Sequence, residues 1–149
     1  MPFVANFPLF CIVITLAGSV ASSVLNGKNA FRLNVFVLLT CLVLNGSLLV
    51  YLVTNPQHIT YMMGHFPAPW GNETRFGPLE ALIATVFCIV MLTSLIAGKT
   101  DIFEDVKGKN INLFYTMINL LMSSLLALVY TNDMFTAYVF VEITTIAAC

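Results

Sequence analysis

The sequence predicts an all-α integral membrane protein with about five transmembrane helices. Of its 149 residues, 59% are hydrophobic and only 9% are charged, whereas about 25% of residues are charged in an average soluble domain. The apolar residues gather in runs of about 20, the length that one helix needs to cross the hydrocarbon core. With 6 basic and 7 acidic residues, the chain has no excess of positive charge, which excludes nucleic acid as a partner.

Helix-breaking residues divide the chain into the expected spans. A polar turn at 26–29 separates the first two apolar runs, and Pro56 follows the end of the second. Pro78 suits the first turn of the third span, which Gly98 closes. Capping side chains at 131–133 open the fifth. The expected spans are at about 4–25, 31–53, 79–97, 111–130 and 131–149.

Two connections differ in composition from the spans. Residues 54–77 contain histidine, proline and tryptophan, a mixture that breaks helices and suits the headgroup boundary, so we expect an interfacial loop there, with or without short extended pieces. Residues 98–110 are rich in charge and predict a solvated, cytoplasmic loop. Neither connection is long enough to fold independently, and residues 1–149 therefore form a single membrane domain.

The chain shows no motif for a metal, a cofactor or a catalytic redox site. Its four cysteines fall one apiece in separate apolar runs, and each is expected to be a small buried apolar residue. His58 and His65 have no cysteine or carboxylate spaced to complete a metal site. Nucleophile motifs and glycine-rich phosphate loops are also missing, so nothing in the sequence supports catalysis by a soluble enzyme.

Glu142 is the residue that points most directly to chemistry. Counted from Thr131 at about 1.5 Å per residue, it lies about 16 Å into the membrane, with apolar helix on both sides. Desolvation at that depth favours the neutral acid, so a nearby cation could control proton uptake and release. Tyr138 and Thr145 share its helix face and could hydrogen-bond it. The alternative is a structural acid, with Tyr138 and Thr145 serving helix packing.

A polar stripe runs along the fourth span at helical spacing. It consists of Asn112, Thr116, Asn119 and Ser123. Such stripes usually mediate contact between membrane helices, and the alternative here is a hydrated path beside Glu142. The first span carries a small-residue face that would let another helix approach closely, formed by Thr15, Gly18, Ser19 and Ser22.

Three stretches resemble one family of membrane subunits. They are residues 64–71 (GHFPAPWG), the start of a span near Pro78, and residues 130–143, where Glu142 follows Asp133 by nine positions. All three are similar to the antiporter-like subunits shared by Mrp sodium/proton antiporters, respiratory complex I and membrane-bound hydrogenases. The chain resembles the first part of such a subunit, which has about fourteen helices.

The resemblance implies a role and a set of partners. In the family the glutamate corresponding to Glu142 transfers protons and pairs with a lysine on a later helix, and a redox module or sister subunits drive proton and sometimes sodium movement. The resemblance therefore implies other membrane subunits as partners, including a chain that supplies the lysine-bearing helices. The rival interpretation is a non-transporting structural or assembly subunit.

The distribution of positive charge predicts the orientation in the cell membrane. Five basic residues lie near the first and third connections and one in the second: Lys28, Arg32, Lys99, Lys107 and Lys109 against Arg75. The positive-inside rule then places loops 26–30 and 98–110 in the cytoplasm and the N-terminus outside. Single cysteines placed at positions 107 and 70 are therefore expected to react with impermeant reagents from the cytoplasmic and external sides, respectively. Labelling of position 107 from outside alone would contradict this orientation.

Overall fold

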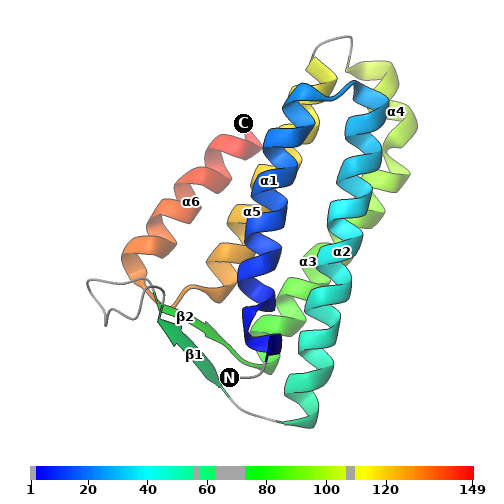
Figure 1. Ribbon diagram of the computed structural model, residues 1–149. Coiled ribbons are helices and arrows are strands. Elements are labelled where there is room, and N and C mark those ends of the chain that lie inside the picture. Colours follow the sequence, from blue (N-terminus) through cyan, green and yellow to red (C-terminus); the bar gives the residue numbers. More distant parts are fainter. Residues whose placement is uncertain (1–2, 56–57, 63–72, 107–109) are drawn as a thin grey trace.

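The computed structural model describes residues 3–55, 58–62, 73–106 and 110–149 (Figure 1). A 3-10 turn at Phe3–Asn6 comes first. The longer helices are α1 (Phe7–Val24), α2 (Gly27–Thr54), α3 (Pro78–Ala97), α5 (Asn110–Tyr130) and α6 (Met134–Ala148). The short elements are strands β1 (Ile59–Met62) and β2 (Glu73–Phe76) and helix α4 (Lys99–Asp105).

Helices α1, α2, α3 and α5 are each long and apolar enough to cross a membrane, which confirms the expected all-α membrane fold. α6 is also apolar, but its 15 residues extend about 22 Å, less than the roughly 30 Å hydrocarbon core. The spanning helices lie side by side, with α1 packed between α5 and α2, and α2 packed on α3 (Figure 1). α6 packs on α5 and is inclined to the bundle.

The interior of the bundle contains small polar side chains among apolar ones, and its outer surface carries many large apolar side chains. In α1 the buried positions include Thr15, Ser19 and Ser22, while Val24 is 84% exposed. This small-residue face lies against α5, and Gly18 sits beside the side chains of Val37 and Asn119. Small residues allow helix backbones to approach closely, and the outward apolar side chains suit lipid. The small-residue face expected in the first span therefore packs inside the bundle.

Asn45 joins four helices at the centre of the bundle. Its side-chain nitrogen on α2 lies 3.4 Å from the sulfur of Cys11 on α1 and 3.6 Å from that of Cys88 on α3. Its side-chain oxygen accepts a 2.5 Å hydrogen bond from the hydroxyl of Tyr130 on α5. Cys41 lies next to Cys11, and each thiol faces the other's backbone carbonyl. Asn45 is fully buried, so these contacts replace water for its amide.

The cysteines only partly follow the sequence expectation. Cys11, Cys41 and Cys88 are buried as expected, but they contact a polar amide. Cys149 is exposed, because it follows the last residue of α6 where only a shallow apolar hollow adjoins it. The prediction that every cysteine is buried is therefore wrong for Cys149.

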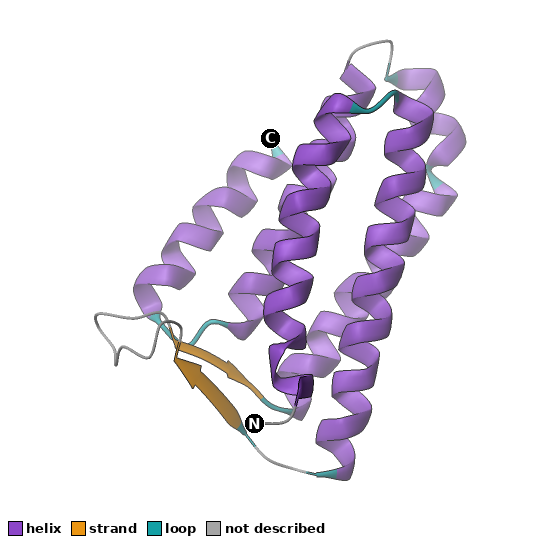
Figure 2. Ribbon diagram, in the orientation of Figure 1, coloured by secondary structure: helices purple, strands orange, loops and turns teal. Residues whose placement is uncertain are grey.

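The connections contain regular structure. Within the expected loop 54–77, β1 and β2 form an antiparallel pair at one end of the helices (Figure 2). In the expected loop 98–110, α4 forms because Ile102 and Phe103 pack against the core while charged neighbours remain exposed. The hairpin also fixes the turn before α6: Thr74 pairs with Thr131, and the Asn132 amide donates to the Glu73 carbonyl at 2.8 Å.

Asp133 caps the first turn of α6. Its carboxylate accepts hydrogen bonds from the backbone amide of Thr136 at 3.0 Å and from the Thr136 hydroxyl at 2.7 Å. The side-chain hydrogen bond, followed by the backbone one, holds the pKa of the Asp133 carboxyl below its ordinary value. The cap satisfies a backbone donor that the helix itself leaves free. Asp133 and the hairpin together define where α6 begins.

We expect Asn45→Leu to lower the free energy of unfolding by about 1–3 kcal/mol, because it leaves the buried Tyr130 hydroxyl without an acceptor. Tyr130→Phe should also destabilise, and the double variant should lose less than the sum of the two. Denaturant titration in detergent measures these changes. The control is Thr93→Val, since the exposed Thr93 hydroxyl bonds only carbonyls of its own helix. Equal stability of Asn45→Leu and the control would contradict the analysis.

Asp133→Ala is expected to fray the first turn of α6 and to speed hydrogen exchange at the Thr136 amide, whereas Asp133→Asn should retain much of the protection. The pKa of Asp133 is lowered in the folded state. The stabilisation that its carboxylate gives to the first turn of α6 is therefore complete above the unfolded pKa and is lost as the pH falls through the folded pKa. The protection factor of this amide, which is the intrinsic exchange rate divided by the observed rate, should therefore fall at acid pH in the wild type only. The same acid response in Asp133→Asn would refute this assignment.

Candidate functional site

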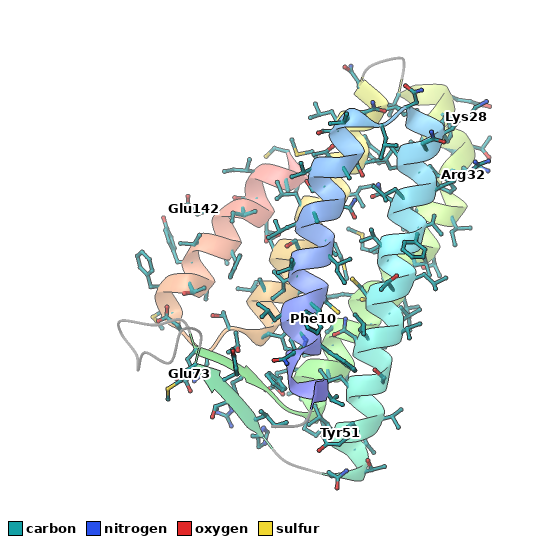
Figure 3. All side chains as sticks on the ribbon, viewed as in Figure 1. Phe10, Lys28, Arg32, Tyr51, Glu73 and Glu142 are labelled. Carbon is teal, nitrogen blue, oxygen red and sulfur yellow. The ribbon has the colours of Figure 1, made fainter. Side chains whose placement is uncertain are left out.

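Glu142 lies on the outer side of α6 (Figure 3). It is eight residues beyond Met134, the first residue of α6, which places it about 12 Å along the helix. Its side chain is exposed, as are most of its neighbours on this face, and Ala147 is the buried residue of α6. The carboxylate therefore points away from α5.

Tyr138 is the hydrogen-bond partner of Glu142. One helical turn earlier on the same face, its hydroxyl donates to Oε1 of Glu142 at 2.5 Å. The Tyr138 side chain is itself 62% exposed. Thr145 also shares this face, but its hydroxyl donates to the backbone carbonyl of Glu142 at 2.8 Å. Tyr138 therefore hydrogen-bonds the Glu142 carboxylate, whereas Thr145 bonds only a backbone carbonyl.

No cation neutralises Glu142 within the described ranges, where its carboxylate contacts only the Tyr138 hydroxyl. The described basic side chains belong to other elements: Lys28 and Arg32 to α2, Lys99 to α4 and Arg75 to β2. α6 itself carries no basic residue. The site in this chain is therefore an acid and a hydroxyl on an uncovered helix face.

Asn119 and Ser123 lie in a different interface. The Asn119 amide donates to the Ser22 hydroxyl at 3.3 Å, and the Ser123 hydroxyl donates to the Ile12 carbonyl at 3.3 Å. Both partners belong to α1, so this part of the polar stripe joins α5 to α1. The structure does not bring these two residues to Glu142.

Two polar contacts were not anticipated from the sequence. The Thr144 hydroxyl on α6 donates to the Ser124 hydroxyl on α5 at 3.0 Å, which fastens the inner face of α6. Asn34 on α2 donates to the Ser22 hydroxyl at 2.9 Å and completes a buried cluster with Asn119. The sequence did carry a signal for the second contact: an asparagine within a long apolar run needs a hydrogen-bond partner on a neighbouring helix.

Other titratable residues in the described part of the chain, among them one of the two histidines considered above, do not join this site. Glu80 accepts a 2.8 Å hydrogen bond from the Gly77 amide and so caps the start of α3. His58 is exposed, while His65 and the rest of residues 64–71 lie outside the described part of the chain. Among described residues, no three His, Cys, Asp or Glu side chains gather as metal ligands would.

Comparison with known proteins gives two informative matches, although no protein-family model matches the chain. It is 27% identical over 148 residues to NADH-quinone oxidoreductase subunit N of Desulforudis audaxviator (strain MP104C), covering 97% of this chain and 29% of that protein. A chain in the structure of the membrane-bound sulfane sulfur reductase, an archaeal respiratory membrane complex, matches with a TM-score of 0.78 and 20% identity.

The structural match covers 97% of this chain and 29% of the reductase chain. The chain therefore spans less than one third of the length of either protein. At this identity the structural likeness establishes the fold, and the sequence match supplies the link to a named subunit. Together they confirm the resemblance of this chain to part of an antiporter-like subunit of respiratory membrane complexes.

Proposed function

We propose that the chain works in a redox-driven membrane complex as the part of an antiporter-like subunit that carries the proton-transfer carboxylate, Glu142. The observation that carries this proposal is the hydrogen bond from Tyr138 to Glu142 on an exposed face of a membrane helix. Intramembrane carboxylates are rare, and in known proteins they commonly mark proton relays. The redox drive is inferred from the two similar proteins, which are named as an oxidoreductase subunit and a reductase complex.

Energetics explain why this pair suits proton transfer. A charged side chain at the centre of a membrane helix costs about 2.5–3.5 kcal/mol or more, whereas one hydrogen bond between membrane helices contributes about 0.6–2 kcal/mol. The Tyr138 hydroxyl alone therefore does not compensate an ionised Glu142. Either a bound proton or a neighbouring cation must neutralise the carboxylate. When Glu142 changes from the protonated acid to the cation-paired carboxylate, it releases a proton, and the reverse change takes one up.

The proposed partner is a lysine-bearing helix that covers α6. α6 presents Glu142 and Tyr138 outward, and the described part of this chain offers no basic side chain against them. The resemblance to antiporter-like subunits implies such a lysine on a later helix. The transported ion in this proposal is the proton, with or without sodium. We also propose that loops 26–30 and 98–110 face the cytoplasm.

Glu142→Gln tests the proposal because it retains the side-chain volume and removes the titratable carboxyl group. In the assembled complex it is expected to reduce proton uptake by vesicles during redox turnover by about a hundredfold, the scale of a lost acid–base group. Glu142→Asp should restore part of the transport, and Tyr138→Phe should have a smaller effect. The matched control is Glu104→Gln, because Glu104 is exposed on α4.

The assembly state separates transport from folding. Intact subunit composition and electron transfer in Glu142→Gln, with transport lost, would support the carboxylate as a proton carrier. Unchanged proton uptake would contradict it and would favour the non-transporting structural subunit, in which Glu142 only anchors a neighbouring helix. Glu104→Gln should match the wild type in both measurements.

A further inference from the structure

A cationic hollow lies at the end of the bundle opposite the hairpin. Its volume is about 260 Å³, and it is lined by Lys28, Phe31, Arg32, Lys99 and Phe103. Lys28 and Arg32 lie near the beginning of α2, at the upper end of the molecule in Figure 3. We infer that this hollow, hereafter the headgroup site, binds the phosphate-bearing headgroup of an anionic membrane phospholipid.

Two aromatic rings line the headgroup site, and one of them contacts a cation. The Phe31 and Phe103 ring centroids are 6.4 Å apart in an edge-on arrangement, and Lys99 Nζ lies 5.2 Å from the centroid of Phe31. Lys28 and Arg32 are four residues apart, so they share one face of α2. The rings form apolar walls, and three positive side chains surround the opening.

The positive charges of the headgroup site have no counter-ion among the described side chains. Asp101 and Glu104 also belong to α4, but neither lines the hollow, and no ion pair joins a described carboxylate to these cations. Like charges four residues apart on a helix repel each other. An anion bound between them would relieve this repulsion, and the N-terminal end of α2 adds to the positive potential.

The surface beside the headgroup site fits a lipid better than a soluble phosphate. Continuing from Arg32 along the same face of α2, the next side chains are Phe36, Leu39 and Val43, which are 68%, 49% and 62% exposed. This apolar track runs along a helix long enough to cross the membrane. A phospholipid would place its phosphate among the cations and its acyl chain along the track, as basic pockets between membrane helices do with anionic lipids.

Native mass spectrometry of the full chain in neutral detergent can measure this binding. Phosphatidylglycerol is expected to bind at least about tenfold more tightly than phosphatidylcholine. Lys28→Gln, Arg32→Gln and Lys99→Gln should each weaken phosphatidylglycerol binding about fivefold, the value expected for one basic residue near an anionic lipid, and the triple variant about a hundredfold. The matched control, Arg75→Gln, removes an exposed positive charge from β2 and should change nothing.

Three binding results of the variants and lipids would overturn the inference, in addition to the outcomes of the competition and crosslinking experiments below. They are equal binding of the two lipids, an undiminished preference in the triple variant, or an equal loss in Arg75→Gln. A competition experiment with inorganic phosphate distinguishes the free ion from the lipid. Displacement of phosphatidylglycerol by equimolar phosphate would assign the hollow to the free ion and refute the proposed lipid binding. If the triple variant loses helical content, the test rests on the single variants and on crosslinking of the wild-type chain with a photoactivatable phosphatidylglycerol. Crosslinks must then fall on peptides containing Phe31 or Phe103, and crosslinks elsewhere alone would refute the site.

Discussion

The hydrocarbon core of a membrane offers no hydrogen-bond partners, and this constraint organises the whole chain. The buried asparagines within the spanning helices find partners inside the bundle, where Asn45 contacts three other helices and Ser22 accepts hydrogen bonds from Asn34 and Asn119. Valine, leucine and phenylalanine occupy the outer surface. Polar contacts thus join the helices inside a largely apolar core, and apolar side chains also cover much of the outer surface.

The Glu142–Tyr138 pair departs from this arrangement, because it faces outward on α6. Several contacts make that orientation definite: the hairpin fixes the turn at Thr131, Asp133 caps the first turn, and Thr144 bonds to Ser124 on the inner face. Rotation of α6 to bury the acid would break the Thr144–Ser124 hydrogen bond to α5. We therefore propose that Glu142 is the carboxylate half of a proton-transfer site. The cation of that site would lie outside the described residues.

The helices could be predicted from sequence, and Glu142 could be singled out as a candidate, because each depends on a local rule. Long apolar runs bounded by proline, glycine and capping residues predict the spans, and one acid within such a run stands out as costly. The pairing of β1 with β2 could not be predicted because each strand has only four residues, and β2 is also held by the bridge from Thr74 to Thr131. Asn45 and the cysteines around it meet only when four helices pack, so linear spacing gave no sign of their contact.

The most direct test of the central claim is a structure of the assembled complex that contains this chain, determined in a lipid bilayer. The measurement is the distance from the Glu142 carboxylate oxygens to the nearest nitrogen of a lysine or arginine in the segment that covers α6. Our account predicts such a nitrogen within about 4–6 Å, or joined to the carboxylate by water. An outer face of α6 in contact only with acyl chains or apolar side chains would contradict the account.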